Sequence, residues 1–166
     1  ARDVAVTPSS VVVAGFTGGV LPGQTPSGLL DGYVRAYDIG GAELWTRQLA
    51  GTGKSDNLAI GVHVTSDVIH TAGRTTGPLS GNASAGDSDA FVAATDLAGN
   101  VVWIRQFGTE LLDQADDVVT DGSGNVNFST TLTVTVPIGS YISAIATKSN
   151  ATFTTFTDTS EFAQNL

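Results

Sequence analysis

The chain repeats itself with a period of 58 residues, and this repeat constrains its fold more than any other feature. The stretch LWTRQLAG contains Trp45-x-Arg47-Gln48, and VWIRQFGT contains the same motif 58 positions later. The second copy consists of Trp103, Arg105 and Gln106. The match extends through the preceding acidic and apolar positions, so that Asp31, Asp38, Asp89 and Asp96 form two equivalent pairs. A motif that recurs at a fixed period is typical of a structural unit that is stacked.

Each repeat unit has the pattern of four short strands separated by turns. DVAVT alternates apolar and other residues, and SVVVAGFTG is an apolar run that ends at glycine. A loop rich in Gly, Pro and Ser then leads to DGYVRAYD, and AELWTRQLA follows a glycine turn. Helical periodicity is missing, so we expect an all-β protein.

A third unit begins near Gln114 and is degenerate. ADDVVT, GNVNFSTT, YISAIATK and TFTTFTD occupy the strand positions, but Trp-x-Arg-Gln is lost. Terminal units of repeat arrays are commonly atypical because one of their faces has no neighbour.

The ordered pattern DVAVT…VVVAGFTG…DGYVRAYDIGGAELWTRQLAG resembles the bacterial β-propeller repeat family, whose members carry seven-bladed β-propeller type repeats. The resemblance covers the first two units well and the third weakly. It implies a propeller fold and an extracellular or cell-surface setting in bacteria. It implies no common activity, because propellers serve many functions.

We therefore expect a β-propeller-like array of about three four-stranded antiparallel blades in a single repeat domain, residues 1–166. Blade 1 spans about residues 1–53, blade 2 about 54–111 and the degenerate blade 3 about 112–166. A β-sandwich adhesin domain is the alternative, and the self-match argues against it. Three blades do not close a ring, since propellers use about four to eight. We expect other copies of the chain, or the remaining blades of a longer parent, as partners.

The repeated Trp, Arg and Gln side chains are the candidate binding residues. On a strand, Trp45 and Arg47 share a face, and so do Trp103 and Arg105. The favoured interpretation is that each Trp packs between adjacent blades. The alternative is an aromatic and Arg surface that binds a glycan or peptide, together with Gln48, Gln106 and the long loops.

The candidate metal ligands lie in the acidic stretch DQADDVVTDGSGN. Asp121, Ser123 and Asn125 place oxygen atoms at alternate positions, as at the start of a calcium loop, but the glycine and closing Glu of an EF-hand are missing. A weak surface Ca²⁺ site is the alternative to a polar turn, and we expect no other cofactor. The two histidines, His63 and His70, lack partners at metal-ligand spacing and are interpreted as strand residues.

Charge and composition exclude several functions. The net charge of −9 disfavours nucleic acid, and no apolar run is long enough for membrane insertion. Cysteine is absent, which excludes thiol catalysis, and no catalytic constellation is visible. Low Lys, abundant Thr, Ser and Gly, and acidity favour an exported protein, and the lack of Met favours a processed product or a piece of a longer chain. We expect a non-catalytic extracellular module that acts as a scaffold or protein-interaction surface, with carbohydrate binding as the alternative.

Overall fold

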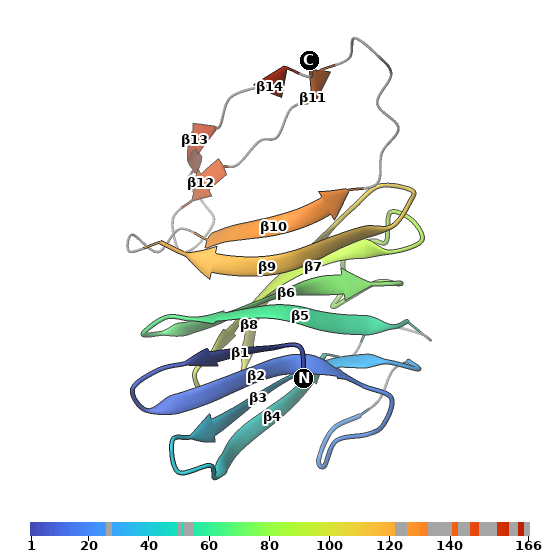
Figure 1. Ribbon diagram of the computed structural model, residues 1–166. Helices are drawn as coiled ribbons and strands as arrows, with labels where there is room; N and C mark the ends of the chain where they lie inside the picture. Colours follow the sequence, from blue (N-terminus) through green and yellow to red (C-terminus); the bar gives the residue numbers. More distant parts are fainter. Residues whose placement is uncertain are drawn as a thin grey trace. The chain divides into compact units, whose positions relative to one another are not determined.

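The computed structural model describes residues 1–25, 28–49, 51, 55–121, 126–132, 141–142, 147–149, 156–159 and 163–164. The chain divides into two compact units, Ala1–Thr133 and Val134–Leu166. The described residues contain strands and turns but no helix, which confirms the all-β class (Figure 1).

The first sheet contains the four strands that the first repeat predicts. They are β1 (Asp3–Val6), β2 (Ser10–Thr17), β3 (Asp31–Asp38) and β4 (Glu43–Leu49). Each strand pairs antiparallel with the next one along the chain, in the order β1-β2-β3-β4. The short β1–β2 and β3–β4 connections allow only antiparallel neighbours, whereas the long loop between β2 and β3 does not by itself determine their direction.

The second sheet repeats this arrangement. Its strands are β5 (Asn57–Val64), β6 (Val68–Thr75), β7 (Asp89–Asp96) and β8 (Val101–Phe107). The order β5-β6-β7-β8 and the antiparallel pairing are the same as in the first sheet. The sequence repeat is therefore also a repeat of structure.

The third repeat does not form a further four-stranded sheet among the described residues. In the first unit, β9 (Asp113–Thr120) pairs with β10 (Val126–Leu132), its one partner strand among the described residues. In the second unit, β11 (Tyr141–Ile142) pairs with β14 (Ala163–Gln164), and β12 (Thr147–Ser149) pairs with β13 (Phe156–Thr159). The third repeat lacks the Trp-x-Arg-Gln strand that completes the other two sheets.

The core of the first unit lies between sheets that face one another. One face of the first sheet packs against the second sheet, and the residues involved include Val12, Ala14, Val34, Ala36, Ile69, Phe91, Ala93 and Ile104. The opposite face of the second sheet packs against β9 through Ala72, Ala90, Val92, Ala115 and Val118. The second sheet is therefore buried on both faces, whereas the first has one neighbour among the described strands.

The β3–β4 and β7–β8 turns are built alike. Asp38 accepts a hydrogen bond from the backbone N–H of Ala42 at 2.8 Å, and Asp96 accepts one from Asn100 at 2.8 Å. Gly41 and Gly99 both have a φ of +86°, a left-handed conformation that glycine adopts without strain. Hydrogen bonds from the side chain and backbone of Asn100 lower the pKa of Asp96, because they stabilise its charged form.

No helix in the described part of the chain has the length and apolar character needed to cross a membrane.

Candidate functional site

Gln48 holds the long loop of the first repeat against its own sheet. Its side-chain amide donates to the Asp31 carboxylate at 2.8 Å and to the Gly19 carbonyl at 3.4 Å. Its side-chain oxygen accepts a hydrogen bond from the backbone N–H of Leu21 at 3.1 Å. Gln48 and Asp31 are both buried, and each gives the other's polar side chain a hydrogen-bond partner. Without that partner, burial of either side chain would destabilise the fold.

Gln106 makes the equivalent contacts in the second repeat. Its amide donates to Asp89 at 2.6 Å and to the Gly77 carbonyl at 3.3 Å, and its oxygen accepts from the N–H of Leu79 at 2.9 Å. Both glutamines thus use their hydrogen-bonding groups within their own repeat. This accounts for their recurrence in structural terms.

Trp45 and Arg47 connect the first sheet to the turn of the second. The indole N–H of Trp45 donates to the Leu97 carbonyl at 2.9 Å, and Nε of Arg47 donates to the Gly99 carbonyl at 2.8 Å. The indole also covers Gly99, where an added Cβ would lie 2.7 Å from Cδ2 of Trp45. The pair therefore joins one repeat to the next.

Trp103 and Arg105 line a hollow of about 520 Å³ beside the second sheet. Ser80, Gly81 and Asn82 of the preceding loop form the other side of this hollow. Trp103 is half-buried and Arg105 is exposed, and both have further interactions within the protein. The long loop and the repeated motif thus meet at one place.

His70 lies beneath Trp103. The ring centroids are 6.1 Å apart, and His70 is paired with His63 across β5 and β6. Burial lowers the pKa of His70, and the positive charge of His63 lowers it further. Because Nδ1 of His70 is buried without a hydrogen-bond partner, the neutral imidazole is the form that the fold favours.

We expect this histidine to make stability depend on pH. The unfolded chain binds this proton at a higher pH than the folded chain does. The contribution of neutral His70 to the free energy of unfolding is therefore complete above about pH 6.5, and it is lost as the pH falls below that value. Thermal unfolding measured between about pH 7.5 and about pH 5.5 should show this loss. His70→Val introduces the residue that the first repeat has at the equivalent position, Val12, and should reduce the loss of stability at acid pH. His63→Ala should show most of that loss. An unchanged loss in His70→Val would contradict the assignment.

A second hollow, of about 420 Å³, lies beside β1, β5 and β9. It is lined by Arg2, Asp3, Ile60, Asp116 and Asp117. Ile60 and Asp116 are β-bulge residues, skipped by the strand registers, and a bulge redirects a side chain out of the ladder. Asp3 uses its carboxylate to accept backbone N–H groups from Val4 at 2.8 Å and from Val62 at 2.7 Å, so it also fastens one repeat to the next.

The predicted surface calcium ligands are only partly described. Asp121 is exposed, whereas Ser123 and Asn125 lie outside the described residues. Within the described ranges, no group of three or more His, Asp or Glu side chains is arranged to hold a metal ion.

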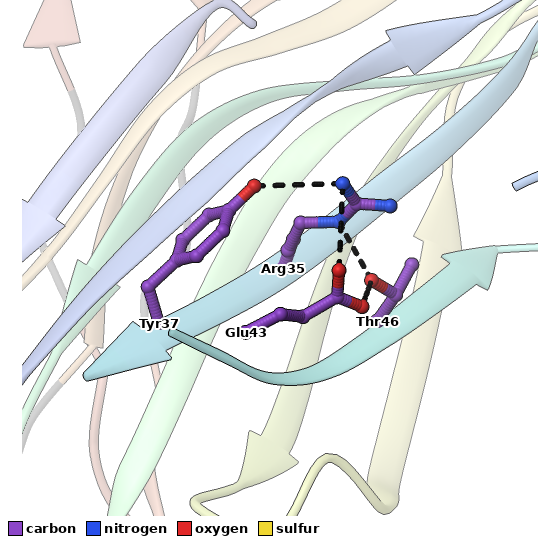
Figure 2. Close-up of polar contacts among 4 residues, drawn as sticks. All are labelled: Arg35, Tyr37, Glu43 and Thr46. Atoms are coloured by element: carbon purple, nitrogen blue, oxygen red, sulfur yellow. Dashed lines mark hydrogen bonds and ion pairs between the residues drawn. The ribbon is translucent and has the colours of Figure 1, made fainter. Parts of the chain in front are cut away.

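The outer face of the first sheet carries a cluster that sequence reasoning missed. Nε of Arg35 donates to Oγ1 of Thr46 at 2.6 Å, and this hydroxyl donates to Glu43 at 2.6 Å (Figure 2). Arg35 also lies 3.7 Å from the Glu43 carboxylate and 3.5 Å from the Tyr37 hydroxyl. The hydrogen bond with Tyr37, followed by the charge of Glu43, raises the pKa of Arg35.

The repeat alignment contained the signal for this cluster. Arg35, Tyr37 and Thr46 occupy the positions of Ala93, Thr95 and Ile104 in the second repeat. The latter three are buried beneath the first sheet, whereas the former three are half-buried on its outer face. The same sheet position therefore has apolar or small residues where a neighbouring sheet covers it, and polar or aromatic residues on the outer face of the first sheet.

Comparison with known protein families and with curated proteins finds no match to this chain.

Proposed function

We propose that this chain is a non-catalytic, exported β-propeller-like module that serves as a structural scaffold and protein-interaction surface. The observation that carries the proposal is the outer face of the first sheet, where Arg35, Tyr37 and Thr46 replace the small or apolar residues of the second repeat. Tyr and Arg are enriched in protein interfaces because they combine apolar area with directional hydrogen bonds.

The recurring motif supports the scaffold role. Gln48 and Gln106 anchor loops, and Trp45 and Arg47 join neighbouring repeats. Side chains that are held in this way stabilise a stack of sheets. Equivalent residues in the first two repeats do not supply the two different environments that acid–base catalysis needs. The stacked meander sheets, together with the resemblance of the repeats, favour propeller-like blades over a sandwich.

The partner that we propose for the outer face is a protein surface, either a second copy of the chain or further blades of a longer parent. Light scattering on a sizing column should give a molar mass that is a multiple of 16.9 kDa if copies associate. Arg35→Glu places a negative charge beside Glu43 and should shift the protein toward the monomer, whereas Asp67→Ala, on an exposed turn, should have no effect. A monomer at every concentration would contradict self-association, and enzymatic turnover abolished by one substitution would contradict the non-catalytic assignment.

Carbohydrate binding at the hollow beside Trp103 is the second candidate. It is favoured by the position of Trp103, Arg105 and Asn82 on the walls of one hollow. A glycan that stacks on Trp103 should quench tryptophan emission in the native protein and in Trp45→Phe, but not in Trp103→Phe. Emission that no glycan changes would contradict this candidate.

A further inference from the structure

Two buried carboxylates meet where the second sheet joins the third repeat. Asp89 is the first residue of β7 and Asp113 is the first residue of β9, and neither is exposed to solvent. Gly108 lies between them, since a Cβ added there would come within 3.0 Å of both Oδ1 of Asp89 and Oδ2 of Asp113. The two oxygen atoms therefore converge on the same small space.

One of these oxygen atoms has no hydrogen-bond partner among the described residues. Oδ2 of Asp89 accepts hydrogen bonds from Gln106 at 2.6 Å and from the N–H of Ala85 at 2.9 Å. Within the part of the chain that the structure describes, Oδ1 of the same carboxylate is buried and accepts no hydrogen bond, and no Lys or Arg forms an ion pair with Asp89. A buried carboxylate oxygen without compensation is costly, so a group that supplies positive charge would stabilise this arrangement.

The other carboxylate is held in a fixed position. Oδ2 of Asp113 accepts hydrogen bonds from the N–H of Thr109 and, at 3.0 Å, from its hydroxyl. Gly108 and Thr109 are only half-buried, so the two carboxylates lie just beneath the surface.

The junction between the first two repeats shows what is different here. Asn57 begins β5 as Asp113 begins β9, and their backbone N–H groups donate to Leu30 and Ser88, both at 2.8 Å. Leu30 and Ser88 are themselves 58 residues apart. The first junction thus has the carboxylate of Asp31 and the neutral amide of Asn57 at these positions, whereas the second has the carboxylates of Asp89 and Asp113.

We propose that Asp89 and Asp113 bind a hard metal cation, of the calcium class, at this second junction. Carboxylate and hydroxyl oxygens are the ligands that Ca²⁺ accepts, and water or carbonyl oxygens complete its shell. Oδ1 of Asp89 and the Asp113 carboxylate are the ligands, with the Thr109 hydroxyl beside them. The cation links the second sheet to β9, and the site is separate from the surface loop at Asp121.

Calcium itself is the probe for this site. Thermal unfolding of the full chain is measured in EDTA and in excess CaCl₂, with NaCl and MgCl₂ controls at matched ionic strength because the chain is strongly acidic. We expect CaCl₂ to raise the melting temperature by several degrees, since a ligand that binds only the folded state stabilises it. Isothermal titration should detect about one bound Ca²⁺ per chain.

Asp113→Asn reproduces the residue of the first junction and should fold, as judged by circular dichroism, but lose the calcium response. Asp87→Asn removes an exposed carboxylate nearby and should keep it. If Asp113→Asn does not fold, Asp89→Asn serves in the same comparison. Absence of Ca²⁺ binding to the native chain, or an equal calcium response in Asp113→Asn, would overturn the proposal.

Discussion

Replacing Phe91 with alanine is expected to lower the free energy of unfolding by about 3–5 kcal/mol. Phe91 is completely buried between the first and second sheets, where it belongs to the same cluster as Val12, Val34 and Ile104. Truncation removes apolar contacts with both sheets and leaves a cavity, because neighbouring sheets relax only partly. Urea unfolding followed by circular dichroism measures the loss.

Tyr33→Ala is the matched control for this substitution. Tyr33 occupies the position of Phe91 in the first repeat but lies half-buried on the outer face. We expect it to cost about 1 kcal/mol, since much of the ring is already in contact with water. Equal losses in the two variants would mean that position within the repeat, rather than coverage by a neighbouring sheet, determines stability.

Gly99→Ala is expected to destabilise the protein by about 2–5 kcal/mol through two separate effects. A φ of +86° costs an L-residue about 1–2 kcal/mol, because its Cβ approaches the following carbonyl. The added Cβ would also lie 2.7 Å from the Trp45 indole, and crowding of this kind costs about 1–3 kcal/mol. The indole would have to move away from the turn to which it is hydrogen bonded. Urea unfolding measures the total loss in the free energy of unfolding.

Gly41→Ala separates the two effects. Gly41 has the same φ in the equivalent turn of the first repeat, but no atom lies within 4 Å of its added Cβ. Gly41→Ala should therefore lower the free energy of unfolding only through its effect on the backbone. The difference between the losses in Gly99→Ala and Gly41→Ala measures the contribution of the Trp45 contact. If the two glycines prove equally sensitive, Trp45 does not hold the turn of the second sheet in solution.

The strands and turns of the first two repeats could be predicted because local physics determines them. Alternation of residues placed Trp45 with Arg47 on one face, and the glycine turns placed β4 and β8 after β3 and β7. The third repeat was less predictable, because its degenerate pattern does not specify which strands pair. Among the strands that the structure describes, β10 pairs with β9 alone.

The contacts between repeats could not be predicted in the same way. The sequence did not indicate that Trp45 donates to Leu97, 52 residues away, or that Gln48 donates to Asp31 across the sheet. The Asp89 and Asp113 pair was hidden because Asp113 follows Asn57 by 56 residues rather than 58, so the two do not align at the period of the repeat. Only the equivalent backbone hydrogen bonds show that these residues correspond.

The sequence by itself determined that this chain is all-β and that its first two repeats form equivalent four-stranded meanders. Strand alternation and turn chemistry act over a few residues, and the 58-residue period shows them twice. Only the tertiary structure decided which sheet faces are covered, and thus why Arg35 is tolerated where Ala93 must be small. It also decided that Asp89 and Asp113 meet. Burial and charge compensation depend on neighbours distant in the chain, and these are brought together only when the sheets pack.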